Sequence, residues 1–151
     1  MLSQANADRA WVSGQLFLIA LVAVAAVLGP HWPARLVVAA VGIAVTITGG
    51  LVMLWGGRTL GRSLTPYPSP RGAHLERGPY RFIRHPMYGG GIGVATGIAL
   101  ASSPIALAPA LALVPFLLFK ARYEERLLRQ ADPAYGEYLS RVRKRFFPGL
   151  L

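Results

Sequence analysis

The sequence predicts an all-α integral membrane protein with about four transmembrane helices and a C-terminal amphipathic helix at the membrane interface. Of its 151 residues, 54% are hydrophobic and 15% are charged, whereas soluble domains carry about a quarter charged residues. The apolar residues form uninterrupted runs long enough to cross a bilayer. The cations, which produce the net charge of +10, lie outside these runs, and 14 of the 16 are in residues 57–87 and 120–151. We therefore expect a single membrane domain over residues 1–151 and no nucleic acid partner.

The first part of the chain predicts a transmembrane hairpin. Residues 11–28 and 36–56 contain no ionisable side chain, and each run is long enough to span. A cleavable signal peptide is the alternative for residues 1–28, because Ala23-Val24-Ala25 resembles a cleavage site. The run exceeds the apolar core of a signal peptide, about 7–15 residues, and Asp8 cancels the charge of Arg9. A retained helix is therefore favoured.

A third run, residues 86–119, contains no charged residue and must fold in two. Its 34 residues would form a helix far longer than the hydrocarbon core of about 30 Å, at roughly 1.5 Å per residue. Ser102-Ser103-Pro104 is the natural turn. We expect transmembrane helices over residues 88–101 and 105–119.

The cations predict the orientation of these helices. The expected cytoplasmic loop 57–87 contains six arginines, and residues 120–151 contain eight further cations, while Arg35 alone lies in the opposite loops. The positive-inside rule then places both termini in the cytoplasm, as expected for a protein of a bacterial inner membrane. The six arginines are Arg58, Arg62, Arg71, Arg77, Arg81 and Arg84.

The C-terminal segment 120–149 is expected to remain in the cytoplasm and to close a binding site. Asp132 and Pro133 have the residue types of a helix N-cap and first turn. Apolar residues then recur at helical spacing, which predicts a helix that lies along the bilayer with this stripe toward lipid. The stripe consists of Tyr135, Tyr138, Leu139, Val142 and Phe146.

Residues 78–93 combine arginines, aromatic rings and His85 with the glycines Gly89-Gly90-Gly91-Ile92-Gly93 at the start of a helix. Glycines there allow a ligand to touch the backbone, and the helix dipole favours an anionic group. Close helix packing is the alternative explanation for the glycines. With three histidines, no cysteine and no HxxxH spacing, a metal site is not expected.

The adjacent acids Glu124 and Glu125 follow directly on an apolar run, where a carboxylate beside an anionic leaflet requires a partner. Arg122 precedes Glu125 by three residues and could pair with it on one helix face. The pair is either a solvated surface ion pair or part of a site in which a carboxylate holds ribose hydroxyls or balances a cationic ligand.

These motifs together resemble the isoprenylcysteine carboxyl methyltransferase family. The resemblance covers residues 58–149 and rests on residues 75–90, Glu124-Glu125, Tyr135, Tyr138 and the residues from Arg145 to Pro148. The related phospholipid N-methyltransferases share the Pro-Met-Tyr, glycine and Glu-Glu elements. Two departures are the small residues Gly89 and Gly91 and the lack of a proline in residues 142–145.

The resemblance implies a pocket without a Rossmann domain, which binds S-adenosylmethionine and releases S-adenosylhomocysteine. As a separate hypothesis from the mechanism of methyl transfer, the candidate catalytic residues are Arg81 and Arg84, either of which would orient an anionic acceptor. The acceptor would be lipophilic or small: a prenylcysteine-like carboxylate, a lipid amine or a thiol. The implied cofactor-binding residues are Arg84, His85, Pro86, Tyr88, Gly90, Gly91, Gly93, Arg122, Glu124, Glu125, Tyr135, Tyr138 and Arg145.

Two alternatives from other classes remain at this point. A membrane reductase that uses NADPH would need arginines for the phosphate groups and more spans. A non-enzymatic membrane protein whose basic face binds anionic lipid would leave Glu125 and His85 dispensable.

Overall fold

The computed structural model describes residues 3–70 and 74–147, and it confirms the all-α class. Arg71 and Pro148, which the sequence analysis names, lie outside these residues. The α-helices of the described part are α1 (Gln4–Leu28), α2 (Arg35–Leu60), α3 (Pro86–Ser102), α4 (Leu107–Ala131) and α5 (Tyr135–Arg141). Short 3₁₀ helices are η1 (Gly61–Ser63), η2 (Gly78–Arg81) and η3 (Pro104–Ala106).

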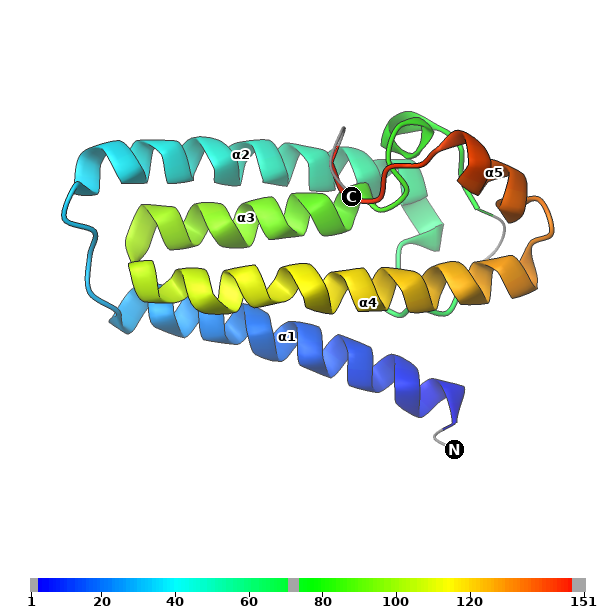
Figure 1. The fold of residues 1–151 in the computed structure, drawn as a ribbon, viewed down its shortest axis with the longest axis horizontal. Helices are drawn as coiled ribbons and strands as arrows, with labels where there is room; N and C mark the ends of the chain where they lie inside the picture. Colours follow the sequence, from blue (N-terminus) through cyan, green and yellow to red (C-terminus); the bar gives the residue numbers. More distant parts are fainter. Residues whose placement is uncertain (1–2, 71–73, 148–151) are drawn as a thin grey trace.

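The four long helices lie side by side, so that the connections gather at two ends (Figure 1). The α1–α2 and α3–α4 connections lie at one end, whereas the segment between α2 and α3, helix α5 and the described N-terminal residues lie at the other. The two cation-rich segments of the sequence therefore share one end of the bundle.

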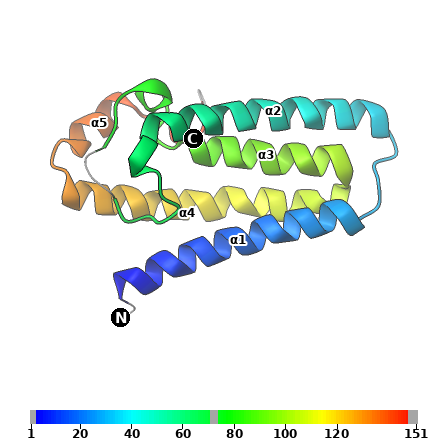
Figure 2. The same cartoon turned by 180° about the vertical axis from the view of Figure 1, so that it is seen from behind.

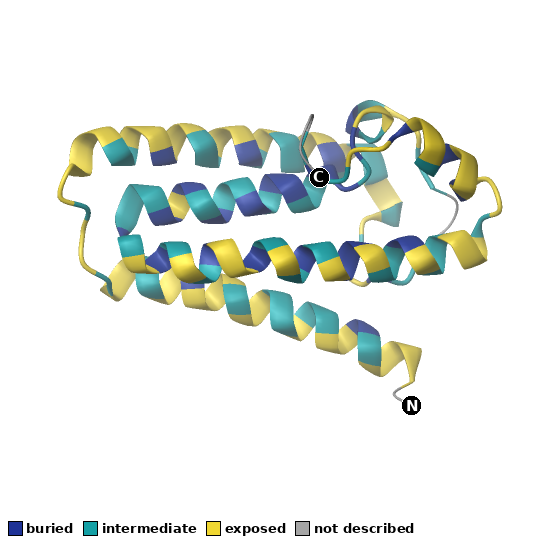
Figure 3. Cartoon of the chain, in the orientation of Figure 1, coloured by how far each residue is buried: buried dark blue, intermediate teal, exposed yellow. Residues whose placement is uncertain are grey.

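Within residues 3–70 and 74–147, three helical stretches are long and apolar enough to cross a membrane, where the sequence predicted about four. They are Gln4–Leu28, Arg35–Ser63 and Pro104–Ala131. Helix α3 has 17 residues and lies between α2 and α4. Its residues are mostly buried or half-buried, whereas the outward face of α2 is exposed, as Figure 3 shows.

Helix α4 does not end at residue 119, where the predicted span 105–119 ends, but extends into the predicted segment 120–149. The helix continues for more than three further turns, to Ala131. Residues 120–131 contain strong helix formers and neither glycine nor proline, and the Asp132-Pro133 pair then ends the helix.

The predicted interfacial helix is shorter than expected, and its apolar stripe does not face lipid. Helix α5 has seven residues, and Tyr135 and Tyr138 are buried within the protein. Beyond α5 the backbone runs along the loop before α3: Arg84 N–H donates to Lys144 O at 2.9 Å, and His85 N–H donates to Arg145 O at 2.8 Å. These long-range hydrogen bonds replace helical ones.

Helices α2 and α3 pack with their backbones in close contact. Gly42, Gly49 and Gly56 of α2 are spaced by seven residues, and all three are buried. A Cβ atom at Gly49 would lie 2.6 Å from the carbonyl oxygen of Gly90, so only glycine permits this approach.

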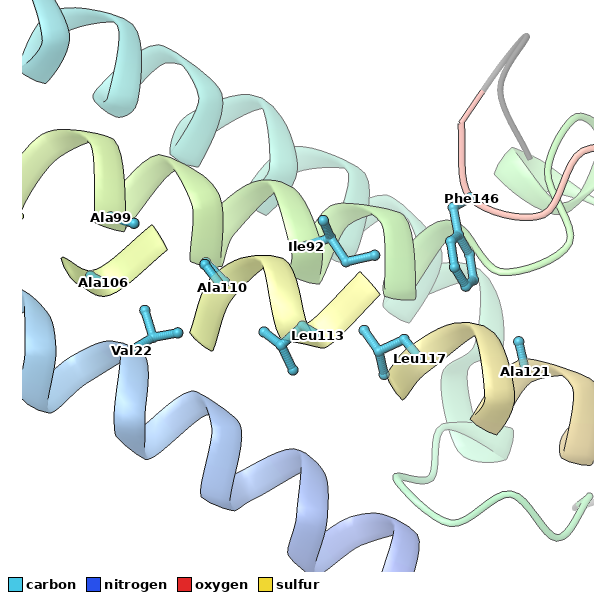
Figure 4. Packing of buried hydrophobic residues seen from close by; sticks show 10 residues of the cluster. Val22, Ile92, Ala99, Ala106, Ala110, Leu113, Leu117, Ala121 and Phe146 are labelled. Atoms are coloured by element: carbon cyan, nitrogen blue, oxygen red, sulfur yellow. The ribbon is translucent and has the colours of Figure 1, made fainter. Parts of the chain in front are cut away.

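The apolar core lies between α1, α3 and α4 (Figure 4). Small residues such as Ala99 and Ala110 are fully buried there, while Ile92, Leu113 and Leu117 fill the remaining volume. Helix α1 joins this core through Val22 and diverges from α4 toward its N-terminus, as the reverse view in Figure 2 shows.

Candidate cofactor-binding site

A cavity of about 390 Å³ lies at the end of the bundle that holds α5 and the segment between α2 and α3. Small-molecule sites typically enclose roughly 300–1,000 Å³. Methionine and leucine side chains form its apolar walls. The polar lining residues are Gln15, Ser63, Thr65, Tyr67, Ser69, His74, Tyr80, Arg84, His85, Tyr88, Lys120, Glu124, Tyr135 and Tyr138.

The adjacent acids of α4 have different surroundings. Glu124 lines the cavity and accepts a hydrogen bond from the Tyr88 hydroxyl at 2.8 Å. Glu125 is buried and does not line it. Successive residues of a helix are rotated by about 100°, so that one acid faces the cavity while the other faces the protein interior.

Glu125 connects three cationic or imidazole side chains. Its Oε1 lies 3.0 Å from Arg84 Nη1 and 3.2 Å from His85 Nε2. Arg145 donates from Nε to Oε1 at 3.1 Å and from Nη2 to Oε2 at 3.2 Å. This carboxylate therefore joins α4 to the loop before α3 and to the C-terminal segment.

The rings of His85 and Tyr88 stack at the start of α3. Their centroids are 5.2 Å apart and the planes differ by 2°. Because both side chains line the cavity and each contacts an acid of α4, the start of α3 is fixed against that helix. Burial raises the pKa of Tyr135 and Tyr138, and the Tyr138 hydroxyl donates to Tyr80 O at 2.8 Å.

A proline-rich segment, residues 64–70, covers one side of the cavity and is attached to α1. Ser69 donates to the buried Asp8 and accepts a hydrogen bond from Gln4 Nε2 at 3.2 Å. Lys120 Nζ donates to Pro66 O at 2.9 Å. Helix α1 and helix α4 thus both hold this segment in place.

His74 closes another side of the cavity through a cluster with two acids. Its Nδ1 lies 2.6 Å from Asp132 Oδ2, and its Nε2 lies 2.9 Å from Glu76 Oε1. Burial of the ring lowers the pKa of His74, but hydrogen bonds to both acids outweigh burial, and the net pKa is raised. Arg141 also contacts Glu76, at 2.7 Å.

A second, larger and mostly apolar cavity of about 990 Å³ lies on the other side of the loop before α3. Residues of this loop line the two cavities: Tyr80 and Arg84 face the first, whereas Arg81 and Ile83 face the second. Apolar residues of α2 and of the C-terminal segment complete the second cavity. Its basic residues are Arg81, Arg141, Arg143 and Lys144.

Comparison with known proteins decides the family. The phospholipid methyltransferase family model matches residues 37–136, which is most of the chain. The chain belongs to this family. No curated protein matches it. Membership establishes a membrane methyltransferase of the kind that uses S-adenosylmethionine.

In this phospholipid methyltransferase family member, many of the motif residues named from the sequence gather around the first cavity. Its lining includes Arg84, His85, Tyr88, Glu124, Tyr135 and Tyr138. Pro86 is buried at the first position of α3, and Arg145 reaches the site through Glu125.

Other motif residues lie elsewhere. Gly90 and Gly93 pack against Gly49 of α2 and line the second cavity, so these two glycines serve close helix packing in the structure. Gly91 has more room, because a Cβ atom at this position would lie 4.0 Å from Met53 Sδ, at the limit of van der Waals contact.

Arg122 does not form the expected pair with Glu125. Its guanidinium is exposed and lies over the Phe119 ring, 5.8 Å from the centroid. Among the ion pairs of residues 3–70 and 74–147, those of Glu125 involve Arg84, His85 and Arg145 instead. The three partners lie in other segments of the chain, so that residue spacing within α4 could not predict these contacts.

Lys120 lines the first cavity, and the sequence reasoning missed it. It stands at the end of an apolar run, where lysine is usually a membrane-boundary residue. The available signal was its spacing of four residues from Glu124, which places both on one helix face.

Proposed function

We propose that this family member binds S-adenosylmethionine in the first cavity and methylates a lipophilic acceptor at the cytoplasmic face of a bacterial inner membrane. One observation carries the proposal: Glu124, His85 and Tyr88, from the family motifs, line one cavity at the end of apolar helices. A water-soluble donor can reach this end from the aqueous phase, while a lipophilic acceptor arrives laterally from the bilayer.

The residues of the first cavity fit the chemistry of this cofactor. S-adenosylmethionine has a sulfonium cation, a ribose diol, an adenine ring and an amino-acid group. Glu124 supplies a carboxylate, and Tyr80, Tyr88, Tyr135 and Tyr138 supply aromatic faces and hydroxyls. Glu124 beside the cations Arg84 and Lys120 suits a ligand that carries both charges better than NADPH, whose charged groups are all phosphates.

The bound cofactor would supply an electrophilic methyl group. Methyl transfer to a carboxylate or thiolate acceptor requires neither a metal nor a proton transfer. The contribution of the protein is therefore alignment and exclusion of water. Residues 64–70 cover the cavity, and Glu125 fixes Arg84 and His85 at its edge.

We place the apolar part of the acceptor in the second cavity, along α2. Arg81 lines that cavity and would orient an anionic acceptor group, while Arg84 lies on the cofactor side of the same loop. This proposal keeps four spans, with α3 as the fourth, and both termini in the cytoplasm. An isoprenylcysteine carboxyl methyltransferase-like activity on a prenylated carboxylate fits the anionic acceptor best.

Calorimetric titration of the detergent-purified chain with S-adenosylmethionine, S-adenosylhomocysteine and NADPH tests the cofactor. Binding of both adenosyl compounds and not of NADPH is expected, and the reverse result rejects the proposal. Transfer of a labelled methyl group to prenylcysteine, lipid-amine and thiol panels then tests the acceptor. Arg81→Gln should reduce transfer to the carboxylate more than transfer to the amine.

A further inference from the structure

Within the described residues, Lys120 is a buried cation without a carboxylate partner. Its side chain is 0% exposed, and it extends from α4 to the first cavity. Nζ donates to two neutral acceptors, Gln15 Oε1 at 2.5 Å and Pro66 O at 2.9 Å. None of the ion pairs formed within residues 3–70 and 74–147 includes Lys120.

A buried ammonium group of this kind favours an anion in the adjoining cavity. An ammonium group has three hydrogen-bond donors, and the two neutral acceptors use two of them. Both acceptors are neutral, so that no carboxylate contacts Nζ directly, while Glu124 and Asp8 attract the ammonium group from farther away. Burial of a charge without a contacting counterion is costly inside a protein. The Tyr88 ring, 5.4 Å from Nζ, offsets only part of this cost.

Glu124 lines the same cavity one helical turn further along α4. Residues four apart lie on one face of a helix, about 5–6 Å apart at Cβ. The cavity wall therefore presents a cation and an anion side by side. An α-amino acid presents the opposite pair, a carboxylate and an ammonium group attached to one carbon atom.

We propose that Lys120 and Glu124 form a recognition pair for the α-amino-acid group of the methyl donor. Lys120 binds its carboxylate, and Glu124 binds its ammonium group while retaining the hydrogen bond from Tyr88. This assignment rests on the proposed function, and it makes Lys120 a binding residue in addition to its contact with residues 64–70.

Ligands that lack one charged group test this assignment in the full-length chain. The ligands are S-adenosylhomocysteine, its decarboxylated analogue and its deaminated analogue, and calorimetry measures each dissociation constant. The wild-type chain should bind S-adenosylhomocysteine at least tenfold more tightly than either analogue. In Lys120→Met, the ratio between the intact and decarboxylated ligands should fall to about one.

The variant Glu124→Gln independently tests the second residue of the proposed pair. It should lose discrimination against the deaminated ligand and keep discrimination against the decarboxylated one. Arg129→Met, which removes an exposed cation of the same helix, should keep both ratios. Lys120→Arg should restore discrimination for the carboxylate, because it retains the cation.

The possible failures are distinguishable. If Lys120→Met weakens the binding of all three ligands equally, Lys120 acts only through its contact with residues 64–70, and the assignment is overturned. A wild-type chain that binds the three ligands equally also overturns it, whether or not the variants fold. A wild-type chain that binds none of them rejects the proposed function itself.

Discussion

Glu125 and Arg145 form a bidentate ion pair between α4 and the C-terminal segment, with contacts of 3.1 and 3.2 Å. The Glu125 carboxylate is 3% exposed and also contacts Arg84 and His85. Its role in the structure is therefore to hold the loop before α3 and residues 142–147 against α4.

Glu125→Ala should destabilise the protein by about 3–5 kcal/mol, because it leaves buried cationic groups without their partner. Unfolding in detergent, followed by circular dichroism against denaturant, measures the loss. Arg129→Ala changes an exposed residue of the same helix and should have an effect within about 0.5 kcal/mol. Equal stability of the two variants would contradict the role assigned to Glu125.

Gly89→Ala should displace the C-terminal segment. A Cβ atom at Gly89 would overlap the carbonyl oxygen of Phe146, which is backbone and cannot rotate away. We expect a loss of about 1–3 kcal/mol, together with weaker binding of S-adenosylhomocysteine. The matched control is Gly91→Ala, whose Cβ would have 4.0 Å to Met53 Sδ. The same unfolding and calorimetric measurements would show no difference between the two if the segment were free to move.

The His74 cluster should make stability depend on pH. The pKa of His74 is raised above its ordinary value of 6.5, so protonated His74 stabilises the folded state. This contribution is complete below the unfolded pKa and is lost as the pH rises through the higher folded pKa. The pKa values of Glu76 and Asp132 are lowered, mainly by their hydrogen bonds to His74, so their contribution is lost only in acid.

Replacement of the ring isolates this contribution. The stability difference between wild type and His74→Gln should be largest near pH 6 and smaller near pH 9, measured by thermal unfolding in detergent. Taking the difference removes the effect of groups that titrate in both proteins. A difference that is constant over this range would exclude His74 as the titrating group.

Asp8→Ala should loosen residues 64–70 without unfolding the bundle. It removes the acceptor of the Ser69 hydroxyl, although the contact between Lys120 and Pro66 remains. Faster amide exchange at Tyr67 and Ser69 and faster dissociation of S-adenosylhomocysteine are expected. Arg9→Ala, at the exposed neighbouring position, should leave both rates unchanged. Unchanged exchange in Asp8→Ala would mean that α1 does not hold the segment.

Local features of the sequence were sufficient to predict the four long helices and the turn between α3 and α4, although not the residues at which α4 and α5 end. The charge-free run of residues 86–119 is too long for one span, and α3 indeed ends at Ser102 while η3 begins at Pro104. The motif residues around the cavity were also identifiable, since His85, Tyr88 and Glu124 are distinctive residue types at the ends of apolar runs.

Contacts between distant segments could not be predicted in the same way. Which of Glu124 and Glu125 faces the cavity depends on the rotation of α4 relative to its neighbours. The short length of α5 results from hydrogen bonds of residues 144 and 145 to the loop before α3. Both depend on tertiary packing, which overrides helical periodicity.

Helix α1 lies outside the segment that matches the family, yet Gln15 from this helix contributes to the wall of the first cavity. Asp8 and Gln4 of the same helix hold the segment that covers it. Part of the wall of the first cavity therefore comes from outside the segment that identifies the family. Exchanging helix α1 between relatives should consequently change the dissociation rate of a ligand in the first cavity, while the motifs that identify the family stay unchanged.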